Sequence, residues 1–382
     1  MLAPNTPSDQ TSKIGQTDCG QIRSLQSSDV PAVAALFQKT FRNPRLQAPS
    51  SLRDYLAELF LRHPWGSDGV HSLVFLDDRD RLKGFIGLLP LRLRHRGNLL
   101  RAAVLGSLMA ENPAENPLIG ARLVRAALRG SQDISISESA NPLSLKMWEL
   151  AGGRSLSLHS MTWLRIFRPV AMPFALLARG PRSQRTCSTI VSPVDAMLNR
   201  LRCNPFSPDS LQMSNCIDSV SGVEEFIDAV PRLTSHYSVK PDWDAATLRW
   251  QLEHAATKEK FGGLQCRLVR KGSRTIGGFS YYSRPGGIGF VLQVFAEPEH
   301  QFAVVNSLLA RAASDGCVAI RGRTQPELLD PLIRLKALLF QRSSTVVFAK
   351  DKEFIPSLCA GDALITGLAA EAWTRLIGGE FV

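Results

Sequence analysis

The 382-residue sequence lacks any apolar run near the roughly 18 to 20 residues that a membrane-spanning helix requires. Its first 20 residues are polar and rich in Ser, Thr, Gln and Pro, without the basic start and apolar middle of a secretion signal. We therefore expect no membrane span, a disordered tail over residues 1–19 and a cytoplasmic protein.

The sequence also lacks the spacings by which metal sites and disulfide frameworks are recognised. Its 7 cysteines are scattered singly, no two form a CxxC pair, and their number is odd. The 7 histidines show no HxxxH spacing. These absences argue against a zinc knuckle and against a disulfide framework. We expect reduced thiols packed as small hydrophobic side chains, and no metal cofactor.

Positive charge is in excess but is nowhere concentrated. The formal net charge is +11, and the basic residues are mostly arginines spread along the chain. Nucleic acid, anionic lipid, an acidic acyl-carrier protein or the phosphates of a nucleotide cofactor would each suit this charge. No basic segment is interleaved with aromatic residues, so we do not expect nucleic acid as the partner. Arg92, Arg94 and Arg96 alternate along one predicted strand, and they form either a phosphate- or carrier-binding face or a solvated hairpin face.

The composition is that of a globular protein with real cores, at 44% apolar and 21% charged residues. The length suggests two or three domains. One order of elements occurs twice: strand, two helices, three antiparallel strands, helix, strand, helix, strand. This repetition suggests an internal duplication with a period of roughly 190 residues.

The expected elements follow from apolar periodicity and from turn and capping residues. In the first half we predict helices at 30–41, 52–61, 118–128 and 142–151, and strands at 21–25, 70–76, 84–93, 100–109, 133–137 and 156–167. In the second half we predict helices at 223–230, 245–256, 302–313 and 327–340, and strands at 211–220, 265–270, 275–283, 289–295, 318–321 and 344–349.

This element order is similar to that of the GNAT superfamily of acyltransferases. Residues 22–33 look like the first strand and helix of that family, and residues 139–153 resemble its penultimate strand and last helix, with Asn141, an aromatic residue and a closing glycine. In the second half the likeness rests on element order and on Ile-Gly-Gly-Phe at 276–279. The chain also resembles two-domain bacterial proteins of unassigned activity. The resemblance implies an α/β fold with mixed sheets: a GNAT-like domain at 20–168, a linker at 169–210 and a second, degenerate GNAT-like domain at 211–382.

The resemblance also implies acetyl-CoA or another acyl-CoA as substrate. In the family, the thioester lies where the fourth strand leaves the fifth, and its pyrophosphate lies at the start of the next helix. The matching positions here are Leu108, Met109, Ala110, Gly120, Ala121 and Asn141. The usual Arg/Gln-x-x-Gly-x-Gly motif has become Glu115 to Gly120, with Leu118 at the first glycine and Pro117 removing one N–H donor. We expect weakened binding; an ordinary helix started by proline is the alternative.

The catalytic residues of the family are only partly matched. Its acid is often a tyrosine in the last helix, where this chain has Trp148, whose indole cannot act as an acid. Its base is often a glutamate near the end of the fourth strand, which makes Glu111 the candidate here. Ser137, Glu138 and Ser139 offer hydroxyl and carboxyl groups, or are simply a polar strand end.

In the second half, the loop at 297–301 has no glycine and carries two carboxylates, so we expect no cofactor there. The leading hypothesis is an acyltransferase that moves an acyl group, most simply acetyl, from a coenzyme A thioester directly to an amine or hydroxyl of an unknown acceptor. Two alternatives stay open: a catalytically inactive binding or scaffold protein derived from the same fold, and acyl transfer from an acyl-carrier protein.

Overall fold

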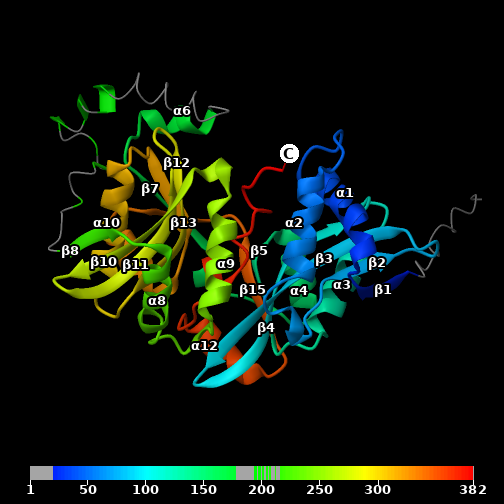
Figure 1. The fold of residues 1–382 in the computed structure, drawn as a ribbon. Helices are drawn as coiled ribbons and strands as arrows, with labels where there is room; N and C mark the ends of the chain where they lie inside the picture. Colours follow the sequence, from blue (N-terminus) through cyan, green and yellow to red (C-terminus); the bar gives the residue numbers. More distant parts are fainter. Residues whose placement is uncertain are drawn as a thin grey trace, which may run out of the picture.

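The computed structural model describes residues 20–177 and 216–381, with short stretches between 193 and 211. The expected tail at 1–19 and most of the expected linker at 169–210 lie outside the described residues. Two mixed sheets with helices on their faces form two lobes (Figure 1). No helix in the described part of the chain is long and apolar enough to cross a membrane.

The first sheet consists, in spatial order, of β1 (Gln21–Ser24), β2 (Leu73–Leu76), β3 (Leu82–His95), β4 (Asn98–Ala110), β5 (Ile134–Ala140), β15 (Ser344–Ala349) and β6 (Arg154–Ser155), and β9 (Val239–Pro241) pairs with β3. Helices α1 (Val30–Phe41) and α2 (Ser50–Leu61) cover one face, and α3 (Leu118–Leu128) and α4 (Pro142–Leu150) cover the other. Side chains of β3 pack into both cores: Phe85 faces α1 and α2, whereas Ile86 faces α3. Burial on both faces explains why this strand is almost continuously apolar.

The second sheet consists of β14 (Leu338–Gln341), β7 (Met161–Ile166), β13 (Ala319–Arg323), β12 (Ile288–Ala296), β11 (Arg274–Ser283), β10 (Gly263–Lys271) and β8 (Cys216–Val220). Helices α8 (Val223–Leu233) and α9 (Ala245–Ala256) cover one face, and α10 (Gln301–Ser314) and α11 (Leu329–Arg334) the other. The short helices α5 (Ser157–Ser160), α6 (Ala171–Leu177) and α12 (Ile355–Cys359) lie in connections.

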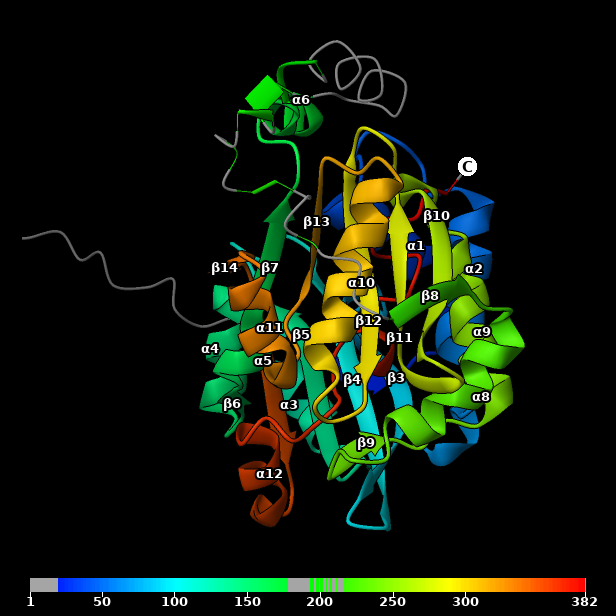
Figure 2. The ribbon, with the colours of Figure 1, turned by 90° about the vertical axis from the view of Figure 1, so that its left-hand side faces the viewer.

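The two halves of the chain exchange their final strands. β7 follows the first half in sequence but pairs antiparallel with β13, with Ile166 opposite Ala319. β15 follows the second half but pairs antiparallel with β5, with Ala349 opposite Ile134. Figure 2 shows β7 beside β13 and β14. The domain boundaries expected at 168 and 211 follow the chain, whereas each sheet contains strands from both halves.

A C-terminal segment, residues 361–381, runs between the two lobes (Figure 1, red). Most of its apolar side chains are buried, among them Leu364, Ile365, Leu368 and Trp373. They belong to one hydrophobic cluster that also contains side chains of α1, α2, α8, α9 and both sheets. The two lobes therefore share a single central core.

Most expected elements are present, with shifted ends, but two assignments were wrong. The helix expected at 327–340 ends at Arg334, and residues 338–341 form β14, which pairs with β7. Leucines that continue the helical spacing caused this error, and Lys336, at φ +61°, sets the turn between the two elements. The strand expected at 156–167 starts only at Met161, because residues 157–160 form α5.

The arginines of β3 are used inside the fold. Arg92 pairs with Asp68 (Nε to Oδ2, 2.8 Å), and Arg94 pairs with Asp242 (Nε to Oδ1, 2.7 Å). Asp242 directly follows β9, so the second of these ion pairs joins the two halves of the chain. Because both guanidinium groups are ion-paired, neither is free to bind a phosphate.

Candidate active site

The first sheet opens between β4 and β5. Their parallel pairing covers only residues 102–104 of β4 and 134–136 of β5. Further along β4, a β-bulge places Ser107 and Leu108 opposite the single residue Ile86 of β3, and Ser107 takes a φ of +51°. A bulge bends its strand and breaks the regular ladder. As a result, residues 105–110 make no ladder with β5 on their free side.

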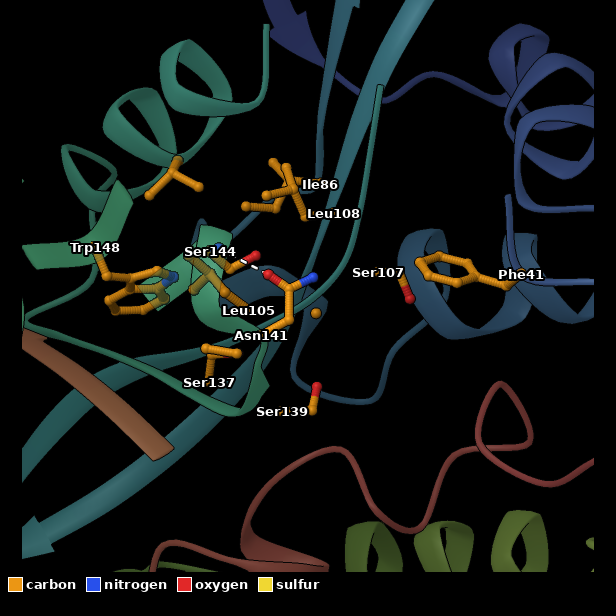
Figure 3. A pocket seen from close by; sticks show the side chains of 13 residues that line it. Phe41, Ile86, Leu105, Ser107, Leu108, Ser137, Ser139, Asn141, Ser144 and Trp148 are labelled. Carbon is orange, nitrogen blue, oxygen red and sulfur yellow. Dashed lines mark hydrogen bonds between the residues drawn. The ribbon is translucent and has the colours of Figure 1, made fainter. Parts of the chain in front are cut away.

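A cavity of about 130 Å³ occupies this gap and is called the cleft below. Its walls come from α1, β4, β5 and α4 (Figure 3), and its polar lining includes Ser107, Ser137, Ser139, Asn141 and Ser144. The Oδ1 atom of Asn141 accepts a hydrogen bond from the Ser144 N–H at 2.8 Å, which caps the N-terminus of α4. Trp148 of α4 also lines the cleft, and its indole is visible in Figure 3.

The expected cofactor residues fall into two groups. Leu108 and Asn141 line the cleft. Met109 points into the core beneath α1 and α2, and Ala110 packs on the opposite face. Gly120 is buried, and a Cβ added there would lie 3.3 Å from the Met147 Cε atom, so this glycine permits α3 to pack closely on α4.

Helix α3 is the next element in the chain after β4, the strand that lines the cleft. Pro117 is its N-cap residue and supplies no side-chain cap, and Ala121 lies half-buried in the first turns. Glu115 accepts a hydrogen bond from the Asn112 side chain (3.2 Å). The side chain of Leu118 is exposed.

The expected base, Glu111, lies just beyond β4 and does not line the cleft. Its carboxylate forms ion pairs with Lys83 and with Lys39 (Nζ to Oε1, 3.5 Å). The hydrogen bond from Lys83 and the charges of both lysines lower the pKa of Glu111. A carboxylate with a lowered pKa is a weaker base.

A different carboxylate, Glu371 of the C-terminal segment, contacts two residues that line the cleft, Gly106 and Ser139. Its side chain is buried against β4, so closely that a Cβ added to Gly106 would overlap Oε2. The Ser139 hydroxyl donates a hydrogen bond to Oε1. Burial raises the pKa of Glu371 to about 7, and the negative charge of Glu138 adds to this rise. The sequence alone does not indicate a role for this residue, because its partners are more than 200 positions away.

Glu138 is a second buried carboxylate at the same place. Its Oε1 atom accepts a hydrogen bond from the Gly367 N–H (3.2 Å) and lies 3.7 Å from the Arg323 Nε atom. Its Oε2 atom is buried and has no hydrogen-bond partner among the described residues. Burial raises the pKa of Glu138. Ser137, Glu138 and Ser139, proposed from the sequence as polar strand-end candidates, therefore all reach cavities.

A second cavity of about 430 Å³, called the basic cavity below, adjoins the cleft on the other side of Ser139 and Glu371. It is lined by Glu138, Ser139, Thr162, Phe290, Arg321, Gly322, Arg323, Arg342, Ser343, Glu371, Ala372 and Ile377. Ser139 belongs to the linings of both cavities. Groups bound in the two cavities would thus meet at Ser139, whose hydroxyl is hydrogen-bonded to Glu371.

The matching gap of the second sheet is filled by the chain itself. β12 has a bulge at Leu292, and beyond Val291 its ladder with β13 stops. The Gln325 side chain donates a hydrogen bond to Val294 O (2.8 Å) and accepts one from Val294 N (3.1 Å). The sequence-based expectation of no cofactor in this half rested on the acidic loop, and Gln325 adds an independent physical reason.

No group of three or more His, Cys, Asp or Glu side chains in the described ranges is arranged to hold a metal ion. No protein-family model matches the sequence. A comparison with curated protein sequences likewise gives no match.

Solved structures do resemble the chain. A GCN5-related N-acetyltransferase from Kribbella flavida superimposes with a TM-score of 0.55 and 14% identity, over 89% of this chain and 73% of that one. A probable N-acyltransferase from Enterococcus faecalis gives 0.56 and 8%, over 86% and 72%. A GCN5-related N-acetyltransferase from Anabaena variabilis gives 0.53 and 10%, over 87% and 73%. At such low identity the likeness concerns the fold, and on that ground this chain has the mixed α/β fold of the GCN5-related N-acetyltransferases.

Proposed function

We propose that this protein transfers an acyl group, most simply acetyl, from a coenzyme A thioester to an amine. The observation that carries the proposal is the opening between β4 and β5, with a bulge on β4 and the buried carboxylate of Glu371 against two of its lining residues, Gly106 and Ser139. The fold alone supports acyl transfer only in general terms. The donor, the acceptor and the site residues belong to this proposal.

The thioester would bind along β4 as an added strand would. Backbone groups of residues 105–110 make no ladder with β5, so they are available to the amides of a pantetheine arm. The phosphates would lie at the first turn of α3, where N–H groups and the helix dipole favour an anion. Glu115 repels phosphate there and Pro117 lacks an N–H group, so we expect this part of the site to bind weakly.

The chain can assist the transfer at two points. The acceptor nitrogen attacks the thioester carbon, the carbon–sulfur bond breaks, and coenzyme A leaves as a thiolate that takes a proton from water. Glu371 accepts the proton released by the nitrogen, and a pKa of about 7 suits a general base near neutral pH. Backbone N–H groups of β4 beyond its ladder with β5 would stabilise the negative charge that develops on the carbonyl oxygen.

Replacement of each candidate base by glutamine tests this assignment. We expect Glu371→Gln to lower kcat by about 100- to 10,000-fold, because a general base contributes that much, while the Kd for acetyl-CoA stays near the wild-type value. Glu111→Gln should leave kcat close to wild type. Thiol release measures kcat, and calorimetry measures Kd. The opposite pattern would identify Glu111 as the base.

Two tryptophan substitutions on α4 test where the thioester binds. Ser144 lines the cleft, whereas Lys146 is exposed on the same helix, so Lys146→Trp is a matched control for Ser144→Trp. We expect saturable calorimetric binding of acetyl-CoA to wild type and to Lys146→Trp, and none to Ser144→Trp. If wild type binds neither coenzyme A, acetyl-CoA nor a long-chain acyl-CoA, the proposal fails, and a carrier-protein donor or a non-catalytic binding role takes its place.

A further inference from the structure

The basic cavity carries opposite charges on its walls. Arg321 of β13 and Arg342 of the β14–β15 turn contribute positive charge. Glu138 of β5 and Glu371 of the C-terminal segment contribute carboxyl groups. The volume of about 430 Å³ lies within the range of small-molecule sites, which is roughly 300 to 1,000 Å³.

Arg321 lacks an acidic partner in the described part of the chain, in contrast to Arg92 and Arg267. Arg92 pairs with Asp68, and Arg267 with Asp218. Within the described ranges, no ion pair or hydrogen bond joins Arg321 to an acidic side chain; its guanidinium lies 5.8 Å from the Phe290 ring centre. Burial and the neighbouring charge of Arg342 lower the pKa of Arg321. Arg342 is exposed and likewise has no ion pair among the described residues. A bound anion would pair with both guanidinium groups and would offset the cost of burying the charge of Arg321.

The third arginine of the cavity is already occupied. Arg323 donates hydrogen bonds to backbone oxygens of Ser160 (2.9 Å) and Glu138 and to the Ser343 hydroxyl (2.9 Å). It therefore braces the wall between β5 and the β14–β15 turn. Arg321 and Arg342 are left to meet an anion.

The acidic wall lies where the two cavities meet. Glu138 Oε2 is buried and unpartnered among the described residues, and Glu371 lies beside Ser139. An ammonium group placed here would gain charge-assisted hydrogen bonds and would stand next to the cleft. The two walls would therefore orient a ligand that carries an anionic group at one end and an ammonium group at the other.

We propose that the basic cavity binds the acceptor of the acyl transfer, and that this acceptor is an aminocarboxylate, with its carboxylate at Arg321 and Arg342 and its amine at Glu371. A guanidinium fork matches the two oxygens of a carboxylate, which favours this group over a neutral tail. The inference rests on the proposed acyl transfer for the role of the amine. The binding of the carboxylate does not depend on it.

The test compares amines that differ only in the carboxylate. The twenty L-amino acids, their amides and their decarboxylated amines are offered with acetyl-CoA, and thiol release is followed. Binding of the same compounds to the protein saturated with coenzyme A is measured by calorimetry. We expect at least one amino acid to bind and react about 10- to 100-fold better than its amide and its amine, the range for a hydrogen-bonded charge.

Arg321→Gln supplies the variant, and Arg79→Gln, at an exposed residue outside both cavities, is its control. Arg321→Gln should raise KM for that amino acid by the same factor. KM for its amide and KM for acetyl-CoA should stay unchanged. Because the substitution removes an unpaired charge, its Tm should equal or exceed that of wild type, which shows that the fold is intact. Arg79→Gln should change none of these values.

Equal reaction of acid and amide, an equal loss for both in Arg321→Gln, or binding of no amino acid would each overturn the inference. The two proposals can fail separately. Carboxylate-dependent binding without thiol release would uphold the cavity assignment and reject acyl transfer to these amines. Acetylation of amines regardless of a carboxylate would uphold acyl transfer and reject this acceptor class.

Discussion

At the scale of single residues, the site depends on two neighbouring carboxyl groups that are both removed from water. Glu138 is held by Arg323 and the Gly367 N–H, whereas Glu371 receives one hydrogen bond from Ser139. Withdrawal from water disfavours the charged form of each and raises both pKa values, and the charge of Glu138 raises the pKa of Glu371 further. Glu371 consequently titrates near neutrality, where a small change in its surroundings alters its charge.

This shift makes the stability of the fold depend on pH. The pKa of Glu371 rises from 4.5 to about 7 on folding, so between these values the folded state holds a proton that the unfolded state has lost. The free energy of unfolding should therefore fall as pH rises from 4.5 to 7 and then level off. At about 1.4 kcal/mol per pKa unit, the loss from this group approaches about 3 kcal/mol.

Glu371→Gln should remove this contribution. Denaturant unfolding of wild type and variant at pH values from 4.5 to 8 measures it. The free energy of unfolding of the variant should increase relative to that of wild type as pH rises, by up to about 3 kcal/mol above pH 7. A difference between the two that stays constant with pH would show that Glu371 does not titrate in this interval.

At the scale of elements, the C-terminal segment joins the parts of the site. It contains little regular structure beyond one short turn at Gly367–Ala369, so side-chain and backbone contacts hold it in place. Lys258 donates a hydrogen bond to Ala372 O, and the Arg375 N–H donates one to the Tyr55 hydroxyl (2.8 Å). One partner lies in the second lobe and the other in the first. The segment thereby positions Glu371 between them.

Trp373 anchors this segment and gives a stability prediction. It is 1% exposed and packs edge-on against Trp250 at 5.2 Å between ring centres. Trp373→Ala should cost about 3 to 5 kcal/mol, as large-to-small changes of buried aromatics do. Trp373→Phe should cost less, since the indole N–H has no partner among the described residues.

Leu150→Ala, at a residue that is 81% exposed on α4, serves as the control and should change stability little. Denaturant midpoints compare the three variants with wild type. A loss in Trp373→Ala no greater than that in Leu150→Ala would mean that the segment is not part of the folded core.

At the scale of the whole molecule, the exchange of β7 and β15 ties the two lobes together. Each exchanged strand is an interior strand of the sheet formed mainly by the other half, with partners on both sides. Removing either half would leave a gap in the remaining sheet and an unpaired strand. The shared central core adds buried apolar contact between the lobes.

Cutting the chain between the two halves tests this arrangement. With a protease site inserted between Leu177 and Cys216 and then cleaved, the two fragments should still elute together in size-exclusion chromatography and unfold in one transition. Strand pairing and the common core hold them without a covalent link. Separation of folded fragments under native conditions would contradict the strand exchange.

Much of the local structure could be predicted from the sequence. Helices α1 and α9 and strand β15 occupy the expected residues, since apolar spacing and local signals such as Asp244 at the start of α9 act over a few positions. The opening after β4 was also expected, through the family resemblance, and Leu108 and Asn141 line it. The helix expected at 327–340 was wrong over residues 338–340, which belong to β14, because leucine spacing alone does not distinguish a helix from an edge strand.

The sequence by itself determined the order of elements, the mixed α/β fold class and the polar strand end at 137–139. Only the tertiary structure decided which sheet received each final strand, which backbone groups Gln325 occupied, and that Glu371 and Arg321 face one space. Periodicity and capping report contacts within a few residues. Pairings such as Ser139 with Glu371 span more than 200 positions, and they exist only once the packed core has brought both lobes and the C-terminal segment together.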